Sequence, residues 1–327
     1  MSNNKLDQIA EQLNQSGDYR VIRKYQKSEC YNHGNEADVK SIGVFLDIET
    51  TGLTYSKDKL IELGMVKFEY TEDGRIFRLL EEFNSYQDPR IPIPEHITKL
   101  TGITDDMVKG HSINESEVIS YLDNVDIIIA HNAEFDRAFF ETKFPSIAAK
   151  AWACSMRDID WKSEDISSFK LEYIAYKYGM FYDGHRAIID CLAGIHILAQ
   201  SLFNSRELAL KALLDNALQI RFKLWASNAP YDYKNLLKER EYRWGTHPTL
   251  NIKAWSIEVT EDNVEAEIEY LCSSIYQSFI DIPIEIFDAY SRFSKNDNTI
   301  DSSTKYADKL QWAIGLCRKT ENNNEYL

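Results

Sequence analysis

Two acidic residues stand at the end of an apolar segment near the start of the chain, within residues 44–53. If this segment is a strand, successive side chains point to opposite faces, so Asp47 and Glu49 share one face with Phe45. Two carboxylates at such a short distance repel each other. A half-buried strand offers little water to screen their charges. A divalent cation between them would remove this conflict. The alternative is that the strand has ended and both acids are solvated.

Two further acids occur where they could complete such a ligand set. Asp136 follows the end of an apolar strand at the start of a helix, and ligand sites in open α/β sheets favour that end of a strand. The helix dipole alone also favours an acid in a first turn. Asp190 lies among apolar residues on a helix, where a buried acid needs either a metal or a basic partner. His185 precedes this helix and is a candidate catalyst or a cap.

These residues need a scaffold, and the pattern of apolar residues predicts one. Three strands joined by short connections, followed by alternating strands and helices, predict an α/β fold with a mixed five-stranded sheet flanked by helices. An amphipathic helix near residues 6–13 and a strand over residues 19–23 are expected before this sheet. The expected strands cover residues 41–49, 59–70, 75–86, 125–131 and 151–156, and the expected helices 114–124, 133–144, 168–179 and 186–203.

Length and composition are those of an ordinary globular protein of 327 residues, enough for a large domain and a smaller one. No apolar run reaches membrane-spanning length and no secretory signal is evident, so we expect no membrane partner and a cytoplasmic location. Five scattered cysteines fit a reducing compartment. The expected parts are an N-terminal helix and strand extension (1–40), the main domain (41–204), a basic and aromatic α+β module (205–295), and a C-terminal helix with a disordered tail (296–327).

The charge of the chain is unevenly distributed. The formal net charge is −15, and residues 1–200 carry 22 Lys and Arg against 33 Asp and Glu. Residues 221–255 reverse this balance, with seven Lys and Arg against three Asp and Glu. Proteins that bind nucleic acids normally show a basic surface. Any contact with phosphate must therefore be local, through metal ions and through this basic segment.

Taken in chain order, the four acids and the histidine resemble the active-site motifs of the DEDD superfamily of 3′–5′ exonucleases. The first motif of that family, DxExTGL, matches residues 47–53; the second, HNxxFD, matches 131–136; and the third, HxAxxD, matches 185–190. His185 places the resemblance in the histidine-containing branch, typified by the epsilon proofreading subunit of bacterial DNA polymerase III. The resemblance covers residues 41–200 and implies a ribonuclease H-like fold.

The resemblance also implies the chemistry. Two Mg²⁺ or Mn²⁺ ions would stabilise the attacking and leaving oxygens while a phosphodiester bond of DNA is hydrolysed from the 3′ end. Asp47 would bridge both ions, with Glu49 and Asp190 on one of them and Asp136 on the other. His185 would take the proton from the attacking water. Further residues are implied to contact the terminal nucleotide or shape the backbone around it: Thr50, Thr51, Leu53 and Asn132.

The basic segment interleaves cationic and aromatic residues. A strand, a short helix, two more strands and a helix over residues 263–278 are expected there. Cations can follow phosphates while rings stack on bases, so Arg243 and Trp244 are candidate substrate-binding residues. The alternative is that the aromatic residues form the core of a small domain. The segment resembles a module of some bacterial epsilon-like proteins with the pattern LKxRGYRW, in which Glu241 replaces the glycine.

Two alternative functions remain open. The same five catalytic residues would serve an enzyme that trims RNA, of the ribonuclease T or oligoribonuclease kind. The chain could instead be an accessory subunit that binds a polymerase or a sliding clamp. The segment 200–203, Gln-Ser-Leu-Phe, is weakly similar to clamp-binding peptides, although the end of a helix packed on the core would look the same.

Overall fold

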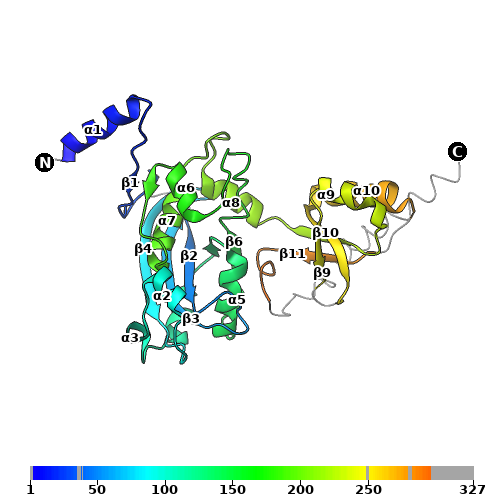
Figure 1. Cartoon of the computed structure of the whole chain (residues 1–327), viewed down its shortest axis with the longest axis horizontal. Helices are drawn as coiled ribbons and strands as arrows, with labels where there is room; N and C mark the ends of the chain where they lie inside the picture. Colours follow the sequence, from blue (N-terminus) through cyan, green and yellow to red (C-terminus); the bar gives the residue numbers. More distant parts are fainter. Residues whose placement is uncertain (1–2, 35–37, 39, 248–249, 279–281, 296–327) are drawn as a thin grey trace. The chain divides into compact units, whose positions relative to one another are not determined.

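The computed structural model describes residues 3–34, 38, 40–247, 250–278 and 282–295. The described chain forms two compact units (Figure 1): the first runs to Ala217 and includes Phe293–Lys295, and the second covers Leu218–Arg292. The predicted C-terminal helix and tail, 296–327, lie outside the described residues. Within the described part of the chain, none of the helices has the length and apolar character needed to cross a membrane.

The first unit is built on a mixed five-stranded sheet in the order β4-β3-β2-β5-β6. An antiparallel meander of β2, β3 and β4 continues into two strands that run parallel to β2. This order, with these strand directions, confirms the predicted ribonuclease H-like sheet. The strands are β2 (Ser41–Thr50), β3 (Leu60–Tyr70), β4 (Ile76–Tyr86), β5 (Ile127–Ala130) and β6 (Ala151–Cys154).

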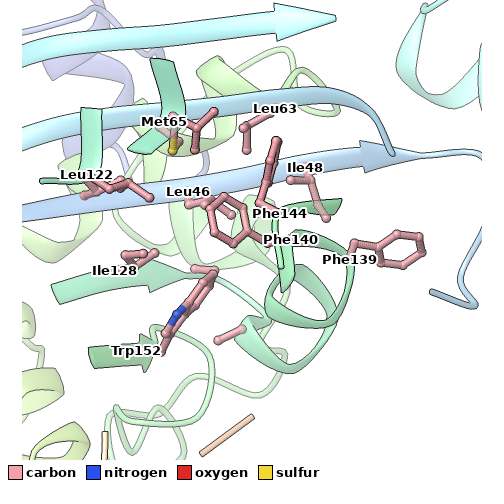
Figure 2. Close-up of a cluster of buried hydrophobic side chains, with 14 of the residues drawn as sticks. Leu46, Ile48, Leu63, Met65, Leu122, Ile128, Phe139, Phe140, Phe144 and Trp152 are labelled. Atoms are coloured by element: carbon pink, nitrogen blue, oxygen red, sulfur yellow. The ribbon is translucent and has the colours of Figure 1, made fainter. Parts of the chain in front are cut away.

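Helices cover both faces of this sheet. On one face, α5 (Ala133–Lys143) packs Phe139 and Phe140 into a core with Leu46 and Ile48 of β2 (Figure 2). The opposite face is covered by α7 (Ala187–Leu198). The other helices of this unit are α1 (Asn3–Gln15), α2 (Glu95–Thr101), α3 (Asp105–Val108), α4 (Glu115–Leu122), α6 (Leu171–Lys177) and α8 (Ala209–Ala217).

The contact between α7 and the sheet depends on glycine. Gly64 on β3 lies opposite Asp47 of β2, and a Cβ atom added there would come within 2.6 Å of the backbone at Ala187 and Ile188. Real Cβ atoms do not approach other atoms so closely, so the absence of a side chain lets the helix start directly over the central strands. The start of α7 is therefore fixed above the face of β2 that carries Asp47.

The N-terminal prediction was only partly correct. The amphipathic helix is confirmed as α1, but the strand expected over residues 19–23 is wrong except at its last residue, because β1 covers only Arg23–Lys24. β1 pairs in parallel with the equally short β7 (Met180–Phe181). Before it, Arg20 donates from its guanidinium to the carbonyls of Tyr176 and Lys177. Hydrogen bonds from a side chain, rather than strand pairing, therefore attach the residues before β1 to the first unit.

The second unit is a four-stranded antiparallel sheet in the order β11-β8-β10-β9. Its described strands and helices confirm the predicted succession of strand, short helix, two strands and helix, and add β11, a strand too short and too close to Pro283 to be predicted. The elements are β8 (Arg221–Ala226), the 3₁₀ turn Tyr231–Tyr233, α9 (Lys234–Glu239), β9 (Arg243–Thr246), β10 (Lys253–Thr260), α10 (Glu261–Tyr270), the π-helical turn Leu271–Tyr276 and β11 (Ile284–Phe287).

The two units divide after Ala217, whereas the sequence placed the domain boundary at 204. The intervening helix α8 explains the difference. It buries Leu210, Leu213 and Leu214, and it packs on β6 and α7 of the first unit. An amphipathic helix belongs with the surface that covers its apolar side.

Candidate active site

Three carboxylates meet above the end of the central strand. Asp47 and Glu49 lie on β2, and Asp190 lies in the first turn of α7. One oxygen from each side chain lies within 4.8 Å of the other two, and we call these residues the carboxylate cluster. The alternation of side chains along β2 places the two strand acids on the face where α7 begins. The structure thus brings together residues that are 143 positions apart.

Burial raises the pKa of every carboxyl in the cluster. For Asp47 the pKa is raised well above its usual range, first by burial and then by the charges of Asp190, Asp136 and Glu49. Burial, followed by the charges of Asp190, Glu62 and Asp136, raises the pKa of Glu49 to about 8, although Arg186 acts in the opposite direction. Burial raises the pKa of Asp190 to about 6, although the Tyr182 hydroxyl and the Arg186 amide donate to it and oppose the rise. The cluster has more negative charge than its protein neighbours neutralise, which is what a divalent cation would correct.

Asp136 lies beside this cluster but outside the group of three. It is in the first turn of α5, as the sequence predicted, and only 3% of its surface is exposed. Burial raises its pKa to about 8 although backbone hydrogen bonds, one of them involving Ile48 of β2, act in the opposite direction. Its charge in turn raises the pKa of Asp47. Asp136 therefore acts electrostatically on the same site from the other helix.

His185 lies in a left-handed backbone conformation, with φ of 64°, just before α7. Its ring is half-exposed, and its Nε2 atom is 3.4 Å from Oε1 of Glu172 on α6. The N-cap position of α7 is occupied by Arg186, so the His185 ring does not cap the helix. The charge of His185 lowers the pKa of Asp190, so the histidine acts electrostatically on the cluster.

A buried ion pair next to the cluster was not predicted. Glu62 of β3 is the cross-strand partner of Glu49 and is fully buried. It accepts hydrogen bonds from the Arg186 guanidinium at 3.1 Å, the Ala187 amide at 3.2 Å and the Asn84 side chain at 3.3 Å. We call this arrangement the Glu62–Arg186 clasp. A signal was present in the sequence, since a buried acid in an apolar strand requires a partner.

Two more partners of the site escaped prediction. The Tyr182 hydroxyl donates to Oδ1 of Asp190 at 3.1 Å, and Glu172 is the carboxylate opposite His185. Neither residue belongs to a motif, so the sequence held no signal for them. His131 of the second motif has a structural role, because its ring bonds both the Ser155 hydroxyl and the Phe169 carbonyl and burial lowers its pKa to about 4.

The expected substrate-contacting residues of the first unit divide into two kinds. Thr50 donates to the Gly52 carbonyl, and the Thr51 hydroxyl accepts from the Lys59 amide, so both hydroxyls shape the loop after β2. Leu53, in contrast, is 85% exposed. Asn132 is exposed, and within the described part of the chain its side chain makes no hydrogen bond. Leu53 is thus the side chain of this group that is best placed to meet a ligand.

The candidates in the second unit are both on its surface. Arg243 and Trp244 are exposed on β9, which is an edge strand, and the Trp244 ring packs edge-on at 5.5 Å from that of Trp255. Trp225 and Tyr242 are buried, as the alternative of an aromatic core predicted. The aromatic residues of this unit therefore divide into a buried set and an exposed one, and Trp244 belongs to the exposed set.

The segment resembling a clamp peptide is part of the fold. Leu202 is buried, and the Phe203 ring stacks on Tyr178 at 4.6 Å. Gln200 donates to the carbonyl of His196 at the end of α7. The interpretation as a helix end packed on the core is confirmed.

A mixed sheet of this order, with carboxylates on its central strand and on the helix above it, defines a nuclease-type ribonuclease H-like domain. A family model described as exonuclease matches residues 44–198. This segment of the chain belongs to that exonuclease family.

Proteins of known name are similar to parts of this chain. The chain is 29% identical over 185 residues to the DNA polymerase III PolC-type of Caldanaerobacter subterraneus subsp. tengcongensis. The matched segment covers 55% of this chain and 13% of that protein. It is 31% identical over 181 residues to the PolC-type enzyme of Clostridium perfringens, covering 54% and 12%. The chain thus spans about an eighth of the length of these relatives. The solved structure of exonuclease I is 15% identical with a TM-score of 0.45, covering 85% of this chain and 73% of that one.

Proposed function

We propose that this protein is a metal-dependent 3′–5′ exonuclease that removes nucleoside monophosphates from the 3′ ends of DNA, single-stranded or frayed. The carboxylate cluster carries the proposal: three carboxylate oxygens within 4.8 Å of one another, inside the segment that matches the exonuclease family. Work in repair, proofreading or turnover within the cytoplasm is consistent with this reaction.

The residues of the cluster fit a hard divalent cation. All its donors are carboxylate oxygens, which Mg²⁺ and Mn²⁺ prefer, and burial together with mutual repulsion raises the pKa values of Asp47 and Glu49, a conflict that a bound cation would relieve. Asp47, Glu49 and Asp190 would hold one ion, and Asp136 with Asp47 a second. A pair of such ions supplies charge stabilisation to the attacking and leaving oxygens of a phosphodiester.

His185 is the proposed general base. Its charge lowers the pKa of the Asp190 carboxyl. In the proposed step the imidazole takes a proton from the attacking water, and the nearby Glu172 carboxylate stabilises the imidazolium that results.

Substrate contacts are proposed in both units. Leu53 would pack against the terminal nucleotide in the loop shaped by Thr50 and Thr51, and Asn132 would border the same site. Arg243 and Trp244 would bind single-stranded substrate through phosphate contact and base stacking. The names of the relatives, which are DNA polymerases, favour DNA over RNA.

The test uses matched 5′-labelled single-stranded DNA, duplex DNA and RNA, each incubated with Mg²⁺ or Mn²⁺. We expect a ladder that shortens from the 3′ end and requires the metal, fastest on DNA. The Asp47→Ala variant, checked for intact folding, should produce no ladder. Full activity in that variant would contradict the metal assignment, and a faster ladder on RNA would make the protein an exoribonuclease.

The second-unit contacts have their own test. The double variant Arg243→Ala with Trp244→Ala should weaken binding of single-stranded DNA by roughly fivefold or more, the size expected for one lost stack and one lost phosphate contact. The double variant Tyr231→Ala with Lys234→Ala, which removes an exposed aromatic residue and the cation over its ring, is the matched control. Equal affinity in both double variants would exclude the β9 surface.

A polymerase partner is the second candidate function. The matched segment occurs in relatives that are named as polymerases, and the chain itself spans only about an eighth of their length. Co-purification of a polymerase with the tagged chain would favour a subunit, whereas full activity of the isolated chain without such a partner would favour a free-standing enzyme.

A further inference from the structure

A second concave site lies in the first unit, at the loop that follows strand β2. It is a cavity of about 180 Å³ lined by the loop between β2 and β3 (residues 51–59), the stretch after β4, and the last turns of α5. The loop is joined to the cluster through β2, because Thr50 pairs with Leu60 and the Thr51 amide donates to the Lys59 carbonyl directly after Glu49. The cavity is therefore anchored to the strand end that carries the catalytic carboxylates.

The charges that line this cavity are not equivalent. Its two acids are bound by backbone amides: Asp58 accepts from Thr54 at 2.8 Å, and Asp88 accepts from the amides of Arg90 and Gly110. Its two lysines, Lys59 and Lys143, have no carboxylate within ion-pairing distance in the described part of the chain. The ammonium groups are thus the charges that remain open to an external anion.

An aromatic residue on an ordered turn completes the lining. Tyr55 is 39% exposed, and the turn that carries it is fixed because the amides of Lys57 and Asp58 both donate to the Thr54 carbonyl. A Cβ atom at Gly52 would come within 2.6 Å of the Asp58 carboxylate, so the loop folds tightly on itself. A ring held in this way loses little freedom when it stacks on a ligand.

We propose that this cavity binds a nucleotide, with its phosphate at Lys59 and Lys143 and its base against Tyr55. The inference deepens the proposed exonuclease function, on which it rests, by assigning a second nucleotide site in addition to the one at the metal cluster. Residues 1–200 carry 33 acids against 22 basic residues, so phosphate must be bound at local sites of this kind. The nucleotide comes either from the bound strand or from the pool of free monophosphates.

Binding in EDTA separates this site from catalysis. Fluorescence anisotropy with a short 5′-labelled oligothymidylate, over a series of salt concentrations, should show that each of Lys59→Ala and Lys143→Ala lowers the slope of log affinity against log salt by roughly one. Tyr55→Ala should weaken binding by roughly fivefold or more, and Tyr55→Phe should restore it, because stacking needs only the ring. Lys57→Ala, an exposed lysine of the same loop outside the cavity, is the matched control.

The outcomes are distinct. If both lysine variants match Lys57→Ala in affinity and salt slope while their melting temperatures equal the wild type's, the cavity proposal is wrong. Thymidine monophosphate that displaces the oligonucleotide from the wild type but not from the lysine double variant identifies free nucleotide as the ligand; no displacement identifies the strand. A wild-type protein that binds through these lysines yet yields no 3′ ladder with metal would refute the exonuclease proposal and leave the cavity intact.

Discussion

Glu49 and Glu62 are cross-strand partners on adjacent central strands, yet their surroundings are opposite. Glu62 is fully buried and is neutralised by Arg186, with amide donors from Ala187 and Asn84 around it. For Glu49, burial and then the charges of neighbouring acids raise the pKa to about 8, and Arg186 offsets only part of that rise. Two identical residues in one ladder thus differ in whether the protein hydrogen-bonds a cation directly to the carboxylate, and the one without such a bond in the described part of the chain is the proposed metal ligand.

The comparison also explains how the site is held. The Glu62–Arg186 clasp joins β3 to the residue that starts α7, and the Arg186 amide donates to Asp190 at 3.1 Å. The protein neutralises one acid to fix the helix, and it leaves the neighbouring acids to a cation. The following predictions test this division.

The largest effect is expected on turnover. Glu49→Gln keeps the size of the side chain but removes a proposed metal ligand, so kcat should fall by about 10²–10³-fold, as on loss of one electrostatic element of an active site. Glu62→Gln, assayed at a temperature where it stays folded, should keep most of its turnover. Steady-state kinetics on labelled single-stranded DNA make the measurement, and equal losses in the two variants would break the comparison.

The free energy of unfolding should respond in the opposite order, with the larger loss on substitution of Glu62 rather than Glu49. Glu62→Ala leaves the Arg186 guanidinium and the buried Ala187 amide without this acceptor, so the free energy of unfolding should fall by roughly 3 kcal/mol, the lower end of the range for a broken buried pair because Arg186 reaches solvent. Glu49→Ala should stabilise the metal-free protein by relieving repulsion. Urea unfolding in EDTA measures both changes, and a loss of stability in Glu49→Ala would contradict the contrast.

A smaller effect is expected at the edge of the cluster. Tyr182→Phe removes the hydroxyl that donates to Asp190, a partner that orients the carboxylate. The Mg²⁺ concentration needed for half-maximal activity should rise by about tenfold, the lower end for loss of such an orienting group. Tyr173→Phe on α6, whose hydroxyl bonds the Ser167 hydroxyl and not a cluster residue, is the control. An unchanged Mg²⁺ requirement would show that Asp190 does not depend on Tyr182.

The smallest effect concerns pH and metal removal. The folded pKa values of Asp190, about 6, and of Glu49 and Asp136, about 8, lie above the unfolded values, so the fold favours the protonated acids. This stabilisation is complete below about pH 4 and is lost as pH rises through 6 to 8. The melting temperature in EDTA should therefore fall by a few degrees over that interval, and Mg²⁺ should restore more of it at pH 8 than at pH 6. If Mg²⁺ raised the melting temperature equally at pH 6 and at pH 8, metal binding would not be coupled to the loss of protons.

The sequence predicted the frame of the site because the relevant signals are local. Strand alternation placed Asp47 and Glu49 on one face, and an acid within an apolar helix marked Asp190. The clasp was missed because Glu62 and Arg186 are 124 residues apart, so their pairing depends on how α7 crosses β3. Likewise Trp225 and Trp244 look alike in sequence, and only the register of β8 and β10 and the edge position of β9 make one buried and the other exposed.

The sheet order also determines how much of the protein must be synthesised before the site can form. The meander of β4, β3 and β2 needs only contacts between neighbouring segments, whereas β5 must return to the open edge of β2 and pairs Gly43 with Ile127. Contacts that span such long stretches of chain close late in folding. Asp190 arrives later still on α7, so a growing chain on the ribosome cannot assemble the full set of carboxylates until most of the first unit has been synthesised. The proposed nuclease activity can therefore begin only when the first unit is nearly complete.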